Sequence, residues 1–173
     1  MIRGFIAGMA AVIIVALVGG YVLLKSGLIP ANADAEPGRL EMWVAGTSLS
    51  ATLRREAPNQ PNPVAPSNDH LIEGVKLYAQ HCVICHGTAS GDASASPVAK
   101  GLYPRPPQLA SEGVEDDPEG ESYWKIKHGI RLTGMPSWAS SLSDREIWTL
   151  ALFLKHMDRL PAPAQLAWKQ VKN

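Results

Sequence analysis

The stretch Cys82-Val83-Ile84-Cys85-His86 decides the fold of this chain. It contains the only two cysteines among 173 residues, and the C-x-x-C-H spacing is typical of covalent attachment of a c-type haem. The spacing places both thiols on one face at the end of a helical turn, where each can bond one vinyl group of a single porphyrin. His86 is then carried under the ring, where its imidazole can bind the iron. The motif predicts one covalently bound haem c.

Two other uses of a C-x-x-C pair fit this chain less well. A structural zinc site takes four ligands of the Cys and His type, and the sequence has no second cysteine pair. His86 also lies too close to Cys85 to complete a zinc tetrahedron easily. A thioredoxin-like redox motif belongs between a strand and a helix, and no strand is predicted before Cys82.

Helical patterns flank the motif on both sides. Good N-cap residues at 67–69 precede a buried stripe that leads into the motif, formed by Leu71, Ile72, Val75 and Tyr78. A second helix begins at Ser143, with Glu146 completing a capping box, and is predicted to run to about Arg159 before Pro161. A third helix is predicted over about residues 120–128. Residues 87–120 are rich in Gly, Pro and Ser and are predicted to be mainly loop.

The sixth iron ligand must come from five methionines and four further histidines. Most candidates are unsuitable because of where they lie in the sequence. Met1 and Met9 belong to an apolar N-terminal run, and Met42 lies before a proline-rich linker. His81 points away from the ring, His128 ends a helix, and His156 and Met157 belong to the C-terminal helix. Met135 differs because Gly134 gives the backbone freedom and Pro136 pushes Met135 out of helical geometry. Met135 is therefore expected opposite His86, with Trp138 packed at the haem edge.

Together these features resemble the class I c-type cytochromes in their bacterial, membrane-anchored, single-haem form. The resemblance covers about residues 68–160 and rests on the haem motif with Gly87, Gly74 and Tyr78, the prolines at 104–107, the stretch 134–138, and Trp148 and Phe153. It implies an all-α fold with three to four helices around one haem, behind an N-terminal transmembrane helix.

The resemblance also implies roles for individual residues. A proline carbonyl should accept a hydrogen bond from the free ring nitrogen of His86, and Pro106 and Pro107 are both candidates. Gly74 and Tyr78 should meet the C-terminal helix at a tight crossing, with Phe153 as the partner. Arg105 faces either a haem propionate or solvent.

The N-terminus carries an uncharged run from Gly4 to Leu24, between Arg3 and Lys25. About 20 apolar residues suffice to span a bilayer, so residues 1–30 are predicted to be an uncleaved anchor. The alternative is a signal peptide cleaved near Ala31-Asn32-Ala33, but signal h-regions are shorter, at about 7–15 residues. The resemblance implies the bacterial inner membrane, crossed once, with the haem domain on the periplasmic face.

Residues 31–66 are predicted to connect the anchor to a haem domain at 67–173. Residues 39–57 have an amphipathic pattern that suits one or two short helices, broken near Gly46. This segment either packs on its own domain or the membrane surface, or binds a partner subunit. The prolines at 58, 61, 63 and 66 then predict an extended, semi-rigid spacer.

The charge balance implies no polyanion partner, since 16 basic residues offset 16 acidic ones, and nucleic-acid binding has no support. An acidic run over residues 112–121 is either a solvated face or a docking patch for a basic partner.

Ligation of the iron by one histidine and one methionine closes it to substrates and raises its reduction potential. Both effects disfavour a haem enzyme or gas sensor. The expected function is single-electron transfer between membrane-bound respiratory or photosynthetic complexes, with no small-molecule substrate; the alternative is a permanent haem subunit of a larger membrane oxidoreductase, such as a terminal oxidase or dehydrogenase.

Overall fold

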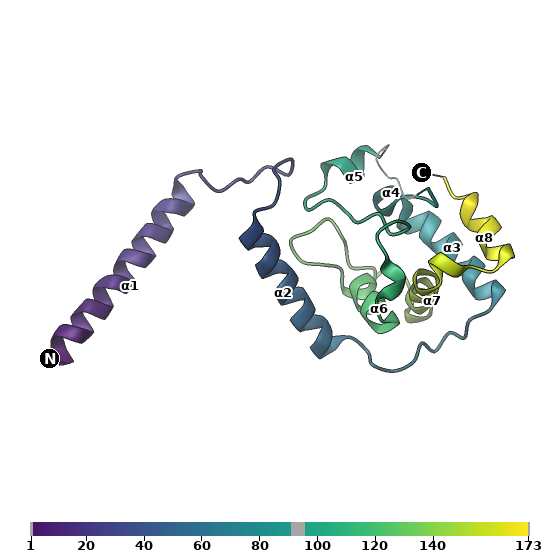
Figure 1. Cartoon of the computed structure of the whole chain (residues 1–173), viewed down its shortest axis with the longest axis horizontal. Helices are drawn as coiled ribbons and strands as arrows, with labels where there is room; N and C mark the ends of the chain where they lie inside the picture. Colours follow the sequence, from purple (N-terminus) through teal and green to yellow (C-terminus); the bar gives the residue numbers. More distant parts are fainter. Residues whose placement is uncertain (1, 91–95, 173) are drawn as a thin grey trace. The chain divides into compact units, whose positions relative to one another are not determined.

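The computed structural model of the chain describes residues 2–90 and 96–172. It divides into two compact units, residues 1–35 and residues 36–173. The described residues form helices and connecting loops, with no β-strand among them (Figure 1). The all-α prediction is confirmed.

The first unit contains the helix α1 (Ile2–Lys25). Its apolar side chains are all exposed, and it has a mean hydropathy of 2.5. Among the described helices it is the one long and apolar enough to cross a membrane. Residues 26–38 then lead to the next helix.

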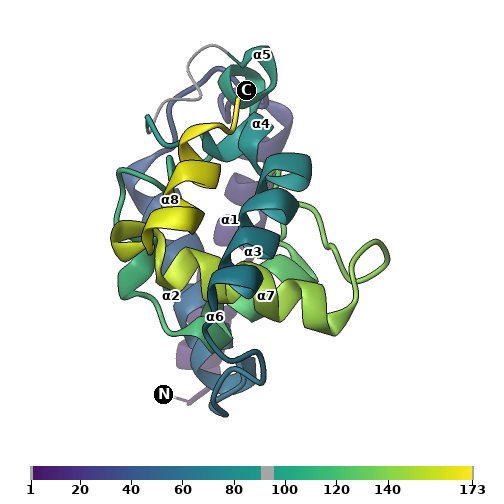
Figure 2. The ribbon, with the colours of Figure 1, turned by 90° about the vertical axis from the view of Figure 1, so that its right-hand side faces the viewer.

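The second unit is built around a crossing of α3 (Asn68–His81) and α7 (Asp144–Lys155). α6 (Glu119–His128) packs on α7, and α8 (Ala162–Lys169) packs on α3 (Figure 2). The remaining elements are α2 (Arg39–Glu56), the short helices α4 (Val83–His86) and α5 (Pro97–Gly101), and the 3-10 turns η1 (Val114–Asp116) and η2 (Met157–Arg159).

The α3–α7 crossing is as tight as the resemblance to class I c-type cytochromes implies. A Cβ placed on Gly74 would lie 2.5 Å from the Cβ of Phe153, so only glycine fits there. The Tyr78 ring lies edge-on to Phe153, with ring centres 5.6 Å apart. Its hydroxyl donates a hydrogen bond to the carbonyl oxygen of Gly87 at 2.9 Å. Tyr78 therefore joins the helix crossing to the end of the haem motif.

The ends of the two long helices differ in how well the sequence predicts them. Ser67 caps α3, and Ser143 and Glu146 form the predicted capping box on α7. α7 stops at Lys155, four residues before the predicted end. The His156 ring nitrogen Nδ1 bonds the Leu152 carbonyl at 2.9 Å, and the His156 N–H bonds the Phe153 carbonyl instead, so the chain tightens into η2.

The helix α8 is not predicted from the sequence, where Pro161 indicates only the end of a helix. Proline also suits the first turn of a helix, where its missing N–H has no partner to lose. Pro161 is the N-cap of α8 and Pro163 lies in its first turn. Trp168 then reaches back into the core, where its ring centre is 5.1 Å from that of Tyr78.

The amphipathic segment is one continuous helix, so the predicted break near Gly46 is wrong. Gly46 is exposed, and a Cβ there would meet nothing within 4 Å. An exposed helical glycine costs about 1 kcal/mol relative to alanine, which does not break a helix held by other contacts. α2 is held on α6 at its C-terminal half, where Leu53 is buried.

The proline-rich segment 57–66 is extended but does not behave as a free spacer. The side-chain amide of Asn62 donates to the Trp148 carbonyl oxygen at 3.0 Å and to the Glu119 carboxylate at 2.8 Å. Val64 is only 3% exposed. The backbone of Pro58 leaves no room for a side chain at Gly120. These contacts attach the segment to α6 and α7.

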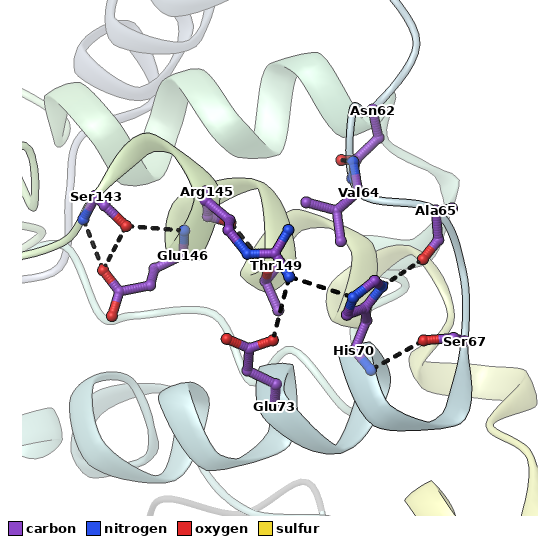
Figure 3. Close-up of polar contacts among 10 residues, drawn as sticks. All are labelled: Asn62, Val64, Ala65, Ser67, His70, Glu73, Ser143, Arg145, Glu146 and Thr149. Carbon is purple, nitrogen blue, oxygen red and sulfur yellow. Dashed lines mark hydrogen bonds and ion pairs between the residues drawn. The ribbon is translucent and has the colours of Figure 1, made fainter.

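Figure 3 shows how the end of this segment joins both core helices. His70, in the first turn of α3, places Nδ1 2.7 Å from the Ala65 carbonyl oxygen and Nε2 3.2 Å from the guanidinium of Arg145 on α7. Arg145 also lies 3.9 Å from the Glu73 carboxylate. The segment, α3 and α7 thus share one polar network.

Candidate haem site

The haem motif forms a single helical turn at the end of α3. Cys82 is the C-cap of α3, and the carbonyl oxygen of Cys82 accepts hydrogen bonds from the N–H groups of Cys85 and His86 at 3.1 and 2.9 Å. Gly87 has φ +79°, a left-handed conformation that glycine adopts without cost, and it ends the turn. No disulfide joins Cys82 and Cys85.

Burial keeps both thiols protonated. It raises the pKa of Cys82 to about 12, with the neighbouring Cys85 adding to the shift. Burial also raises the pKa of Cys85. The turn therefore presents two reduced sulfurs three residues apart, the arrangement that attachment to two vinyl groups requires.

The His86 ring is oriented by a backbone carbonyl. Its Nδ1 lies 2.8 Å from the carbonyl oxygen of Pro107, which resolves the choice between Pro106 and Pro107 that the sequence leaves open. The Pro106 carbonyl accepts instead from the side-chain amide of Gln108 at 3.1 Å. Because Nδ1 donates to Pro107, the proton sits on that nitrogen and Nε2 keeps its lone pair.

Nε2 of His86 has no hydrogen-bond partner among residues 2–90 and 96–172. Burial lowers the pKa of His86, opposed by the hydrogen bond to Pro107 and the charge of Glu112. A neutral imidazole with one nitrogen fixed and the other open is the form that binds a metal, and such a carbonyl bond raises its basicity.

Met135 lies in a loop tied to the C-terminal end of α6. Trp138 and Ala139 donate their N–H groups to the carbonyl oxygens of Ile126 and Lys127, each at 3.2 Å. The Ser137 hydroxyl also donates to Lys127, at 2.7 Å. The loop therefore uses the carbonyls that a helix end leaves without partners.

Close backbone packing fixes the conformation around Met135 itself. Gly129, at φ +67°, lies so near the chain that a Cβ would be 2.7 Å from the Met135 carbonyl oxygen. The Ile130 N–H donates to that same oxygen at 3.2 Å, and the Met135 N–H donates to the Thr133 hydroxyl at 3.1 Å. The Met135 side chain is half-buried against the hydrophobic core.

The Trp138 ring connects this loop to the haem motif. Its centre lies 5.0 Å from that of His81, the residue directly before Cys82. The sequence predicts that His81 points away from the haem and gives it no role, because no spacing rule links it to Trp138. The pair brings together the two segments that carry His86 and Met135.

Three other candidate ligands make contacts that explain their positions without a haem. Met157 is buried beside Leu160 and Trp168 at α8. Both ring nitrogens of His70 are engaged, and His128 packs against Trp124 with ring centres 5.0 Å apart. Met135 stays the candidate sixth ligand.

The acidic run 112–121 is partly engaged within the domain. Glu112 accepts from the Gln108 N–H at 2.7 Å, Asp117 pairs with Lys125 at 2.6 Å, and Glu119 accepts from Asn62. The run therefore offers less free negative charge than its sequence indicates. Arg105 is exposed.

Comparison with known proteins identifies the domain. Residues 70–154 match the family described as cytochrome C oxidase, cbb3-type, subunit III. Residues 70–154 form a class I c-type cytochrome domain. The chain is also similar to part of the quinohemoprotein alcohol dehydrogenase ADH IIB of Pseudomonas putida. The identity is 27% over 157 residues, covering 86% of this chain and 21% of that protein. The chain thus spans about a fifth of the length of this relative.

The match of residues 70–154 to this family implies haem c and haem-based electron transfer for the domain. The side chains of the cytochrome domain fit that cofactor. Two reduced thiols stand three residues apart, an imidazole has one nitrogen fixed by Pro107, and a thioether sulfur comes from a pinned loop. This donor set suits one covalently attached haem with two protein ligands.

Proposed function

We propose that this chain is a membrane-anchored, single-haem cytochrome that transfers single electrons between membrane-bound redox complexes. The observation that carries the proposal is the hydrogen bond from His86 to the Pro107 carbonyl. The bond fixes the ring through Nδ1 and leaves Nε2 open, which is the arrangement of histidines that bind a metal.

In this proposal Cys82 and Cys85 would form the thioether links, and His86 and Met135 would bind the iron. Pro107 fixes the orientation of the imidazole, and Trp138 covers the haem edge. A haem held in this way supplies reversible one-electron exchange at its iron. With both iron ligands supplied by the chain, Met135 and His86 would exclude substrate from the metal, which favours a carrier over an enzyme.

The chain is proposed to cross the bacterial inner membrane once through α1, with the cytochrome domain in the periplasm. The support is the length and hydropathy of α1 and the maturation of c-type cytochromes on the outer face. Arg3 and Lys25 flank the span on opposite sides, so the positive-inside rule alone does not orient it.

A second candidate is a permanent haem subunit of a membrane oxidoreductase. The favouring observation is the family match, because its description is that of an oxidase subunit. In that case the redox partner would be bound stoichiometrically, and the chain would still contribute electron transfer rather than catalysis.

The two candidates are distinguished by purification of the full chain from membranes in mild detergent. A carrier is expected to migrate alone as a red band, whereas a subunit would migrate with partners in fixed ratio. Mass and the pyridine haemochrome spectrum should both report one haem per chain. A chain that matures without haem, or that carries haem without either cysteine, would contradict both candidates.

A further inference from the structure

The helix α2 has two apolar sides, and only one of them is covered. Leu49 and Leu53 lie one turn apart on the side that packs on α6, and Leu53 is 5% exposed. With 3.6 residues per turn, the opposite side carries Leu40, Trp43, Val44, Thr47 and Ala51. Leu40 is 73% exposed, Trp43 66% and Val44 52%. We refer to these five residues as the outer face of α2.

The outer face lacks carboxylates and is bordered by arginines. Glu41 points to the domain side, where its carboxylate lies beside the Tyr103 hydroxyl and raises the pKa of that group to about 12. Arg39 begins the helix, and Arg54 and Arg55 lie in its last turn. A shallow groove runs beside Trp43 and is lined by Met42, Trp43, Gly46, Thr47, Ser50 and Arg54.

The chain leaves this face little distance from the proposed membrane span. α1 ends at Lys25 and α2 begins at Arg39, so the 13 residues 26–38 can reach at most about 45 Å when fully extended. Aliphatic side chains with a tryptophan, flanked by arginines and free of acidic groups, form the composition of a helix that lies in the bilayer interface. Tryptophan in particular favours the headgroup level.

We propose that the outer face of α2 lies in the membrane interface, with Leu40, Trp43 and Val44 among the lipid chains and the arginines at anionic headgroups. This inference rests on the proposed membrane anchoring by α1. Because α2 is packed on α6 and the following segment is bonded to α7, the contact would hold the whole cytochrome domain in one orientation at the membrane.

The test uses the full haem-loaded chain in vesicles of phosphatidylethanolamine and phosphatidylglycerol. A nitroxide label is placed at Val44→Cys on the outer face or, as the matched control, at the exposed neighbour Ala45→Cys on another side of the helix. Electron paramagnetic resonance then compares collisions of each label with oxygen, which enters lipid, and with a water-soluble nickel chelate. The haem spectrum and mass verify that each variant carries one haem.

The expected result is that the Val44 label favours oxygen several-fold over the chelate, while the Ala45 label favours the chelate. Introducing Leu40→Glu and Trp43→Glu together should move the Val44 label into water without changing the haem spectrum, because both residues are exposed. A Val44 label that is accessible to the chelate in vesicle-bound protein would overturn the inference.

Vesicle flotation and dilution into lipid complete the test. If the vesicles do not carry the protein during flotation, the proposed anchoring fails, which is distinct from failure of the α2 contact. The Val44 label could also become accessible to the chelate when the protein is diluted into excess lipid. In that case a second copy of the chain covers the outer face, and the proposed contact with lipid is wrong. Protection that persists on dilution supports the contact with lipid.

Discussion

Gly74 and Phe153 meet so closely that their two helices touch through backbone. A Cβ at Gly74 would lie 2.5 Å from the Phe153 Cβ and 2.9 Å from the Thr149 carbonyl oxygen. Neither of these atoms belongs to a flexible side-chain end. The crossing of α3 and α7 therefore has no space for an added methyl group unless the helices move apart.

Gly74→Ala is expected to destabilise the domain by about 1–3 kcal/mol, the range for overpacking a core. Guanidinium unfolding monitored by haem absorbance measures this change. The matched control is Gly46→Ala in α2, where a Cβ meets nothing and the variant should be more stable by up to about 1 kcal/mol. Equal effects of the two substitutions would show that helix propensity, rather than the crossing, determines the result.

Met135→Ala is expected to lower the reduction potential by on the order of 0.2 V, a fraction of the ~0.8 V range that axial ligands cover. The oxidised wild type should show a weak near-infrared charge-transfer band from methionine ligation, and the variant should lose it and bind carbon monoxide. The fold should persist, because Cys82, Cys85 and His86 are unchanged.

His128→Ala and Met157→Ala are the controls for the ligand assignment. Both should keep the near-infrared band, because His128 packs on Trp124 and Met157 lies at α8. Loss of the band in either of them, together with its survival in Met135→Ala, would assign the sixth ligand to the other residue and reopen the argument against an enzyme.

Stability should depend on pH through the cap of α7. The Ser143 hydroxyl and N–H lower the pKa of Glu146 from its usual 4.5. A carboxylate with a lowered folded-state pKa stabilises the fold above its usual pKa, and this stabilisation is lost as the pH falls through the folded value. Ser143→Ala should lower the free energy of unfolding by about 1 kcal/mol at neutral pH. The difference in this free energy between the variant and the wild type should shrink below pH 4.5.

Ser141→Ala is the control for this cap. Ser141 is exposed two residues earlier and should change the free energy of unfolding by less than about 0.5 kcal/mol at any pH. A Ser143→Ala difference that stays constant from neutral to acid pH would mean that Glu146 does not take part.

Limited proteolysis should identify the mobile tether. A protease that cuts after acidic residues is expected to cut first after the exposed Asp34. The Glu36–Pro37 bond resists such enzymes, and the segment after Glu56 is held by Asn62 and Val64. Washing with carbonate should leave the uncut protein with the membranes. After cleavage the same wash should release a red fragment, because an interfacial helix binds a membrane far more weakly than a transmembrane helix does. This prediction would be contradicted by a first cut after Glu56. The proposed anchor would be contradicted by full-length protein in the soluble fraction, or by a native N-terminus near residue 34 before any protease is added.

The sequence predicts those features that depend on local spacing or on a single side chain. The haem motif and the caps at Ser67 and Ser143 follow from residue type and position, whereas the Gly74–Phe153 contact follows from the resemblance to class I c-type cytochromes. The carbonyl that accepts the His86 hydrogen bond is narrowed beforehand to that of Pro106 or Pro107. Adjacent carbonyls are chemically equal, and only the fold decides which of them faces His86.

Apart from the Gly74–Phe153 crossing, contacts between distant segments are not predicted. Asn62 reaches a carbonyl 86 positions away, and no local pattern marks a proline-rich segment as packed. The His81–Trp138 pair has the same origin. Pro161 is ambiguous because proline both ends one helix and begins another, and Trp168 in the following turns is the available signal.

The short connection at residues 26–38 sets the affinity that any redox partner needs. Thirteen flexible residues have a root-mean-square span of about 20 Å, so under the proposed anchoring α1 would confine the cytochrome domain to a small volume near its own patch of bilayer. A complex anchored alongside would meet that domain at an effective concentration on the order of millimolar. A docking surface with a dissociation constant of that size would already be half-occupied. The domain could then exchange an electron and leave quickly, without the extensive interface that a freely diffusing carrier requires.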